Sequence, residues 1–271
     1  MKIALVQMRS GVDMMGNLAD SEAAIREAAA KGARLIATPE CTHLIQKDKD
    51  ALFAAIKTPD TDPGMVRYGD LAEALNIDLF IGSMAQLGPD GRAVNRSYHF
   101  GPDGQIKAQY DKIHMFDVSL GQGETYSESA NYARGRRAVK TSAQGAKIGL
   151  SICYDVRFAY LYRRLAKAGA QILMVPAAFT QPTGRAHWEV LLRARAIETG
   201  SYVLAAAQGG KHEDGRKTYG HSMVINPWGE VIATLDHNEP GLLYAELDLE
   251  AVASARGRIP ALHGDQEIEG P

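Results

Sequence analysis

Residues 147–158 read Lys-Ile-Gly-Leu-Ser-Ile-Cys-Tyr-Asp-Val-Arg-Phe, and the pattern of this stretch changes at Cys153. Residues 147–152 are a run of Ile, Leu and small side chains, which predicts a strand buried on both faces. From Asp155 onward the pattern is helical, with an apolar side made of Phe158, Leu161, Tyr162 and Leu165. Cys153 is therefore expected where a strand ends and a helix begins. The positive end of a helix favours thiolate over thiol, so Cys153 is a candidate nucleophile.

The composition of the 271 residues is that of a soluble globular protein, with 45% apolar residues. A net charge of −2 with interspersed signs gives no electrostatic case for binding nucleic acid or an anionic membrane. No apolar run is long enough to span a bilayer, and residues 1–8 resemble a core strand more than a secretory signal. Two cysteines do not make a disulfide framework, so we expect a reducing cytoplasm.

Strand and helix patterns alternate in both halves of the chain. Strands are predicted at residues 3–8, 33–38, 78–84, 147–152, 171–175, 202–206 and 241–247, and helices at 18–31, 62–75, 155–168 and 184–199, with a short one from 248. Hairpins are predicted around Gly101-Pro102-Asp103-Gly104, and around Asn226-Pro227-Trp228-Gly229 with flanking strands 219–225 and 230–235. Residues 121–136 lack periodicity and are expected to form a long functional loop. This alternation predicts parallel pairing, two sheets packed face to face with helices outside, and one α/β domain over residues 1–271.

Three reactive side chains follow predicted strands: Glu40 after 33–38, Lys112 after 105–110, and Cys153 after 147–152. Catalytic groups collect at the carboxyl ends of strands in such sheets. A thiol, a carboxylate base and an ammonium suit acyl transfer at an amide or a nitrile. Taken singly, a cysteine on a strand is more often a small core residue, Glu40 is more often an ordinary strand-end carboxylate, and Lys112 is more often a solvated loop lysine. Spacing alone does not bring the three together.

Other candidates have weaker support from the sequence. Cys41 is a rival nucleophile beside Glu40, but no helix starts there, so we interpret it as a packing residue. His187 and His221 could partner Cys153 in the manner of papain-like proteases, but neither stands in the sequence context of that family. No His-Glu-x-x-His or Cys-x-x-Cys spacing occurs, so neither a metal nor another cofactor is expected.

Three blocks of the sequence resemble, in the same order, the signature blocks of the nitrilase superfamily of carbon–nitrogen hydrolases. They are Thr38-Pro39-Glu40, Tyr110-Asp111-Lys112-Ile113-His114 and Gly149-Leu150-Ser151-Ile152-Cys153-Tyr154-Asp155. The resemblance extends from Lys2 to Pro260 and implies a four-layer αββα sandwich that forms a homodimer. It also implies roles for five residues: Glu40 as general base, Lys112 and the Tyr154 N–H as oxyanion donors, Cys153 as nucleophile, and Glu128 as the carboxylate that orients Lys112.

Residues 186–198 and 219–224 are similar to the amidase branch that acts on 2-oxo acid amides, and Ala205-Ala206-Ala207-Gln208 looks closer to deaminated glutathione amidase than to omega-amidase. The resemblance implies hydrolysis of a small linear amide, deaminated glutathione, to 2-oxoglutarate and cysteinylglycine. Omega-amidase action on 2-oxoglutaramate, hydrolysis of carbamoyl amines or other aliphatic amides, and a non-catalytic binding role are the alternatives.

The substrate of that branch carries carboxylates, which planar guanidinium groups bind well. The candidate substrate-binding residues are Phe116, Arg157, Phe179, Thr183 and Arg185. Arg157 could equally hold a structural ion pair. Arg185 and Arg134 depart from the family pattern, since relatives commonly have proline at Arg185 and Pro-Gly at Arg134.

Overall fold

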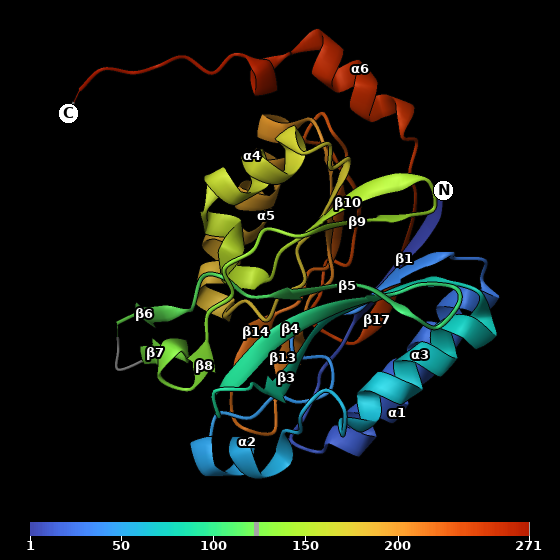
Figure 1. The fold of residues 1–271 in the computed structure, drawn as a ribbon, viewed down its shortest axis with the longest axis vertical. Helices are drawn as coiled ribbons and strands as arrows, with labels where there is room; N and C mark the ends of the chain where they lie inside the picture. The colour runs from blue at the N-terminus through green and yellow to red at the C-terminus, as the bar shows by residue number, and fades with distance from the viewer. Residues whose placement is uncertain (122–124, 271) are drawn as a thin grey trace.

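The computed structural model describes residues 1–121 and 125–270, and two mixed sheets form its centre (Figure 1). The first sheet has the order β17–β1–β2–β3–β4–β5, with β8 beside β4. Its strands are β1 (Lys2–Gln7), β2 (Leu35–Ala37), β3 (Asp78–Leu87), β4 (Ala93–Phe100), β5 (Ile106–Asp111), β8 (Tyr132–Ala133) and β17 (Gly241–Glu246). The second has the order β16–β15–β12–β11–β10–β9. Its strands are β9 (Lys140–Ala143), β10 (Ala146–Leu150), β11 (Ile172–Met174), β12 (Tyr202–Ala205), β15 (Met223–Ile225) and β16 (Val231–Thr234).

Helices cover the outer face of each sheet. Helices α1 (Met14–Ala30) and α3 (Pro63–Leu75) pack on the first sheet, and α4 (Ala159–Lys167) and α5 (Gln181–Thr199) pack on the second. The remaining helical segments are α2 (Lys49–Ala55), α6 (Glu250–Arg258), η1 (Glu128–Ala130), η2 (Cys153–Arg157) and η3 (Ala261–His263). Two small sheets pair β6 (Asp117–Ser119) with β7 (Thr125–Ser127) and β13 (Gly209–Lys211) with β14 (Lys217–Tyr219). The four-layer αββα arrangement is confirmed.

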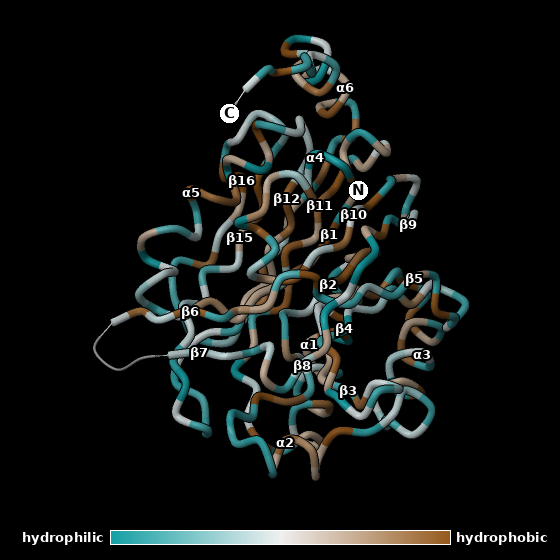
Figure 2. The backbone as a smooth tube through the Cα atoms, turned by 60° about the vertical axis from the view of Figure 1, so that its left-hand side comes forward, coloured by the Kyte–Doolittle hydropathy of each residue, from teal (hydrophilic) through white to brown (hydrophobic). Residues whose placement is uncertain are grey.

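Strand β1 shows how the sequence produces these layers. Successive strand residues point to opposite faces of a sheet, so an apolar run has two buried sides. Ile3 and Leu5 pack in the core between the two sheets, whereas Ala4 and Val6 pack against α1 and α3. Figure 2 shows the same concentration of hydrophobic residues in the central strands β10, β11 and β12. The parallel pairs β1–β2, β2–β3, β10–β11 and β11–β12 agree with the predicted alternation of strand and helix.

Local capping sets the helix ends. The Asp62 side chain accepts a hydrogen bond from the N–H of Gly64 at 2.8 Å, so α3 begins at Pro63, as the sequence predicts. Helix α1 begins before the predicted residue 18, because Asp13 caps it by accepting from the Met15 N–H. Helix α5 begins before the predicted residue 184, because Pro182 fits its first turn.

Several sequence predictions need correction. The α-helix after Cys153 does not begin at Asp155: residues Cys153–Arg157 form a 3₁₀ turn, and α4 begins at Ala159. The expected loop 121–136 contains β7, η1 and β8, and residues 122–124 of it lie outside the described residues. The expected strand 219–225 is divided between β14 and β15. Helix α2 and strands β6, β9 and β13 were not predicted.

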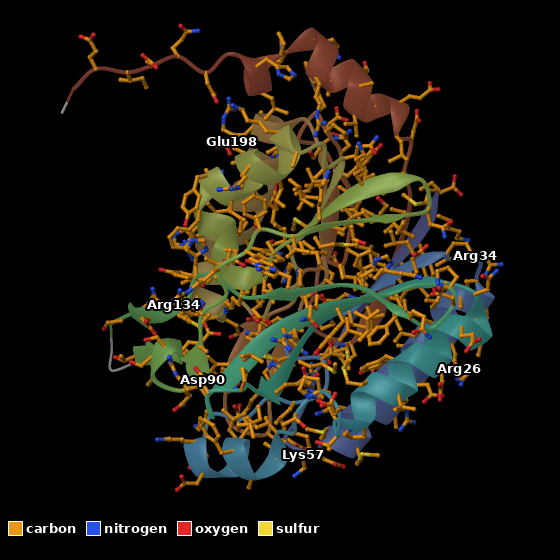
Figure 3. All side chains as sticks on the ribbon, in the orientation of Figure 1. Arg26, Arg34, Lys57, Asp90, Arg134 and Glu198 are labelled. Atoms are coloured by element: carbon orange, nitrogen blue, oxygen red, sulfur yellow. The ribbon has the colours of Figure 1, made fainter. Side chains whose placement is uncertain are left out.

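The periphery of the molecule is charged. Figure 3 labels six exposed side chains of this kind, which lie around the sandwich: Arg26, Arg34, Lys57, Asp90, Arg134 and Glu198. In the described part of the chain, no helix is both long and apolar enough to cross a membrane.

Candidate active site

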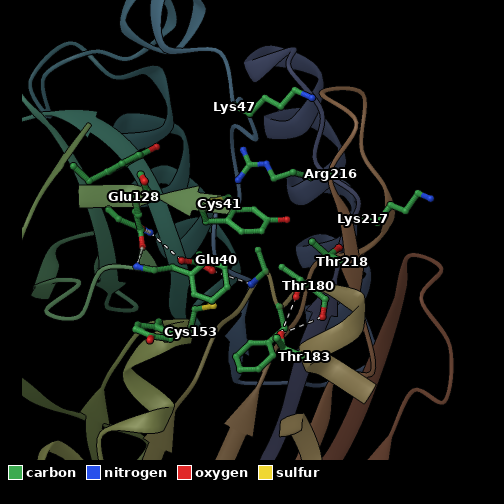
Figure 4. A pocket seen from close by; sticks show the side chains of 18 of the residues that line it. Glu40, Cys41, Lys47, Glu128, Cys153, Thr180, Thr183, Arg216, Lys217 and Thr218 are labelled. Atoms are coloured by element: carbon green, nitrogen blue, oxygen red, sulfur yellow. Dashed lines mark hydrogen bonds between the residues drawn. The ribbon is translucent and has the colours of Figure 1, made fainter. Parts of the chain in front are cut away.

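A cavity of about 900 Å³ opens where Glu40, Lys112 and Cys153 meet (Figure 4). Glu40 follows β2, Lys112 directly follows β5, and Cys153 follows β10, so strands of both sheets supply the site. Glu128 reaches the same cavity from η1. The structure therefore brings together four side chains that are far apart in the sequence.

Glu40 is a buried carboxylate that accepts hydrogen bonds on both oxygens. Its Oε1 accepts from Lys112 Nζ and from Asn95 Nδ2, each at 2.9 Å, and its Oε2 accepts from the Ala178 N–H at 2.8 Å. The Cys153 thiol lies close enough to this carboxylate for each group to shift the pKa of the other. Burial by itself would raise the pKa of the Glu40 carboxyl, but the Lys112 charge and these hydrogen bonds hold it below the usual value. Glu40 is therefore an ionised acceptor beside the thiol.

Lys112 lies between two carboxylates. Its Nζ donates to Glu40 Oε1, and it contacts Glu128 Oε1 at 3.0 Å and Oε2 at 2.9 Å. Burial would lower the pKa of this ammonium, but the charges of Glu128 and Glu40 hold the pKa well above its usual value. The Phe116 N–H donates to Glu128 Oε2 at 2.7 Å and fixes that carboxylate. Lys112 is thus a permanent cation in a fixed position.

Asn95 on β4 is a site residue that was not predicted from the sequence. Its Nδ2 donates to Glu40 Oε1 and to Glu128 Oε1 at 3.2 Å, and so bridges the two carboxylates. Its Oδ1 is buried without a hydrogen-bond partner from the described residues. The sequence gives little signal for this role, because Arg96, Ser97 and His99 are further polar residues of β4.

Cys153 occupies a turn with an unusual backbone. Its φ is +50°, a left-handed value that costs a non-glycine residue energy, and its N–H donates to the Pro176 carbonyl at 2.8 Å. Burial raises the pKa of the thiol well above its usual value, and the charge of Glu40 raises it further, against the opposing charge of Lys112. The expectation that a helix end favours the thiolate was wrong, because only a 3₁₀ turn begins at Cys153 and burial, followed by the Glu40 charge, raises the pKa. The thiol keeps its proton until a base removes it.

Comparison with known proteins agrees with this geometry. The family model of carbon-nitrogen hydrolases matches residues 2–257. The chain belongs to the carbon–nitrogen hydrolase family. It is accordingly a hydrolase of carbon–nitrogen bonds. It is 38% identical over 263 residues to the deaminated glutathione amidase of Synechocystis sp., covering 96% of each protein. It is also 38% identical to the deaminated glutathione amidase of Homo sapiens, covering 95% of this chain and 80% of that protein.

Solved structures resemble this hydrolase over almost its whole length. The NitFhit protein of C. elegans has a TM-score of 0.90 and 36% identity, covering 98% of this chain and 65% of that one. Nit3 of Saccharomyces cerevisiae, a member of the nitrilase superfamily, has a TM-score of 0.87 and 29% identity, covering 98% and 96%. An amidase from Nesterenkonia sp. has a TM-score of 0.79 and 27% identity, covering 96% and 98%; its structure contains acrylamide added to the active-site cysteine. The predicted membership of the nitrilase superfamily is confirmed.

Asp155 connects the segments that carry Lys112 and Cys153 in this hydrolase. Its side chain is fully buried. Its Oδ2 accepts from the Tyr110 hydroxyl at 2.7 Å and from the Ile152 N–H at 2.9 Å, and its Oδ1 accepts from the His114 N–H at 3.1 Å and lies 2.6 Å from His114 Nδ1. Residues on both sides of Lys112 are therefore joined to the residue that precedes Cys153. The sequence pattern indicated Asp155 only as the start of a helix.

The predicted substrate-binding residues occupy different positions. Four of them line the cavity: Phe116, Phe179, Thr183 and Arg185. Arg157 is not among the lining residues. Its guanidinium lies over the rings of Tyr154 and Phe179, at 5.7 Å and 5.4 Å, and contacts His187 Nδ1 at 3.3 Å. Tyr154, whose N–H is the predicted second oxyanion donor, also lines the cavity.

The other candidates from the sequence do not join this cluster. Cys41 lines the cavity, but burial and the Glu40 charge raise the pKa of its thiol to about 12. Neither His187 nor His221 is a lining residue, and His221 Nδ1 lies 2.6 Å from the Tyr219 carbonyl. Within residues 1–121 and 125–270, no group of three His, Cys, Asp or Glu side chains could hold a metal ion.

The charges around the cavity are mostly positive. Besides Lys112, the lining cations are Lys47, Arg185, Arg216 and Lys217, and among the described lining residues the only carboxylates are Glu40 and Glu128. Both carboxylates are already bound to Lys112. A ligand that carries negative charge would therefore be favoured.

Proposed function

We propose that this hydrolase is an amidase that cleaves deaminated glutathione into 2-oxoglutarate and cysteinylglycine through a thioester on Cys153, with no metal and no cofactor. The observation that carries the proposal is the buried Glu40 carboxylate, which binds the Lys112 ammonium at 2.9 Å and lies beside the Cys153 thiol, whose pKa its charge raises. The substrate is suggested by the deaminated glutathione amidases to which the chain is similar, and the positive cavity suits its two carboxylates.

The first half-reaction would form the thioester. Glu40 takes the proton of the Cys153 thiol while the sulfur attacks the amide carbon, and the carbonyl electron pair moves onto oxygen. The oxyanion is stabilised by Lys112 Nζ and the Tyr154 N–H. The C–N bond then breaks, its electron pair stays on nitrogen, and Glu40 returns the proton to that nitrogen as the amine leaves.

The second half-reaction would use water in place of the thiol. Glu40 takes a proton from water as its oxygen attacks the thioester carbon, and the same donors hold the second oxyanion. When the C–S bond breaks, the sulfur takes the electron pair and recovers a proton from Glu40. Glu128 would keep Lys112 in place throughout, because its Oε2 is itself held by the Phe116 N–H.

A Cys153→Ala variant tests the mechanism. Hydrolysis of deaminated glutathione should fall to background while thermal unfolding stays near wild type, because the substitution removes only the small thiol group. Undiminished hydrolysis would eliminate the thiol mechanism. Wild-type protein should also be assayed on 2-oxoglutaramate, simple amides, carbamoyl amines and nitriles. Turnover of a carbamoyl amine alone, with release of ammonia and carbon dioxide, would contradict the proposed substrate.

We also propose a homodimer in a reducing, cytoplasmic setting. The outer helices α4 and α5 expose three large apolar side chains, Tyr160, Val190 and Ile197. Apolar residues on adjacent helices are typical of a subunit interface. Both cysteines are free thiols, which a reducing compartment would preserve. Mass measured in dilute solution tests the dimer, and a fully active monomer would contradict it.

A further inference from the structure

Arg216 projects into the cavity from the turn between β13 and β14. Its Nε donates to Asp214 Oδ2 at 2.7 Å, and its backbone N–H donates to Asp214 Oδ1 at 2.9 Å. Its terminal nitrogens have no hydrogen-bond partner among the described residues, although only 28% of the side chain is exposed. A guanidinium fixed through Nε keeps its outer nitrogens available for a second, planar anion.

The turn that carries Arg216 is held rigidly against the body of the protein. His212 is buried, with its Nδ1 2.8 Å from the Ser10 carbonyl oxygen and its Nε2 2.7 Å from Thr218 Oγ1. The His212 N–H donates to the Arg216 carbonyl at 2.8 Å. Thr218 also forms a strand bridge with Thr180, at the N-terminal end of α5. Arg216 is thus preorganised, which reduces the entropic cost of binding a ligand.

Lys47 adds a second cation at the same end of the cavity. A Cβ at Gly215 would lie 3.3 Å from Lys47 Nζ, so this ammonium is next to the Arg216 turn. Figure 4 shows Lys47 and Arg216 on one side of the cavity, with Cys41 between Arg216 and Glu40. Cys41 is also the residue that follows Glu40 in the chain.

The positions of Glu40, Cys41 and the two cations along the cavity indicate which half of a bound substrate the cations face. In the mechanism above, Glu40 returns its proton to the leaving nitrogen, so the amine half must lie on the Glu40 side of Cys153. Arg216 and Lys47 lie beyond Glu40 on that side, past Cys41. The acyl half then extends toward the remaining wall, which includes Phe179, Thr183 and Arg185.

We infer that Arg216, assisted by Lys47, binds a carboxylate on the leaving-group half of the substrate. The preferred substrates are then secondary amides whose amine product is a carboxylate-bearing amino acid or short peptide, and primary amides lack the group that this end of the cavity binds. The inference rests on the proposed function, because it takes the role of Glu40 from it.

Two substrates with the same acyl half test the inference. Deaminated glutathione has a leaving group that ends in a carboxylate, whereas 2-oxoglutaramate releases only ammonia. For Arg216→Met we expect kcat/KM on deaminated glutathione to fall about 10- to 100-fold, the range for losing a charge-assisted hydrogen bond. On 2-oxoglutaramate it should stay within about threefold of wild type. Arg216→Lys should give a smaller loss on deaminated glutathione, since it keeps the charge but not the planar fork.

Lys211→Met is the matched control. Lys211 is an exposed residue on the neighbouring strand β13, pairs with Lys217 in register, and does not line the cavity. This variant removes the same charge from the same hairpin and should leave both substrates unaffected. Equal losses on the two substrates in Arg216→Met, or no loss on either, would overturn the inference while leaving the proposed amidase intact. If wild type cleaves neither substrate, the proposed function has failed.

A measurement on the wild-type protein covers the case in which Arg216→Met does not fold. Cysteinylglycine should inhibit hydrolysis of 2-oxoglutaramate at concentrations about tenfold lower than cysteinylglycinamide, whose terminal carboxylate is replaced by a neutral amide. Equal inhibition by the dipeptide and its amide would overturn the inference.

Discussion

The Asp155→Asn substitution would test how the catalytic segments are held in register. The introduced side-chain amide would place an NH₂ group where a carboxylate oxygen now accepts two hydrogen bonds. In one orientation this NH₂ faces the Tyr110 hydroxyl and the Ile152 N–H, and in the other it faces two nitrogens of His114. A change of His114 tautomer would rescue the ring contact but not the backbone N–H. At least one buried hydrogen bond to the carboxylate is therefore lost, and in its place the introduced NH₂ donor faces another N–H donor.

The size of the effect follows from these contacts. A hydrogen bond to a charged group contributes about 1.5–3 kcal/mol, so we expect a loss of about 2–4 kcal/mol in the free energy of unfolding. For a protein of this size that corresponds to a fall in Tm of roughly 5–15 °C. Because Lys112 and Cys153 lie on the segments that Asp155 joins, kcat/KM should also fall about 100-fold.

Calorimetry and steady-state kinetics on the same preparation would measure both effects. Asp103→Asn is the control, since Asp103 is an exposed turn residue paired with Lys107, and its replacement should leave Tm and kcat/KM unchanged. If Asp155→Asn melts at the same temperature as wild type and retains its activity, Asp155 does not hold the two segments together.

Three further predictions concern the catalytic cluster. Because the pKa of Glu40 is depressed, its ionised form stabilises the fold above the usual value of 4.5, and this contribution is lost only as the pH falls through the lower folded pKa. The acid limb of a kcat/KM profile should therefore lie below pH 4.5, and a limb above it would contradict the assigned state of Glu40. Iodoacetamide should alkylate Cys153, which has Glu40 as a base, and spare Cys41, whose pKa is about 12. Peptide mass spectrometry measures the labelling of each cysteine, and equal labelling of the two would contradict the assignment of Glu40 as the base for Cys153. Asn95→Leu should lower kcat about 10- to 100-fold with little change in KM, because it removes the bridge between Glu40 and Glu128; unchanged kcat would exclude a positioning role.

The sequence predicted those parts of the site that depend on regular structure. Glu40, Lys112 and Cys153 each follow a strand, β2 and β5 in the first sheet and β10 in the second, and catalytic residues collect at the carboxyl ends of such strands. Glu128 could be assigned only through the family resemblance, because nothing periodic surrounds it. Its position depends on a hydrogen bond from Phe116 that spacing does not encode.

The protonation state of Cys153 could not be predicted from its neighbours in the chain. Local sequence suggested a helix end, but the α-helix begins only at Ala159. The groups that decide the pKa are Glu40 and Lys112, both distant in sequence, together with burial between two sheets. Arg216 escaped notice for a similar reason, since it belongs to a turn that tertiary contacts with Ser10 and Thr180 bring to the cavity.

The pairing of β17 with β1 has a consequence for the order in which the chain can fold. Residues 241–246 lie alongside residues 2–7, so β1 has only one strand neighbour until residues 241–246 have left the ribosome. Every residue of the catalytic cluster is synthesised well before that point. Until β17 arrives, β1 exposes an apolar strand edge, the kind of surface that recruits strands of other chains. The nascent hydrolase therefore carries its full set of reactive groups through a period in which it most needs protection from aggregation.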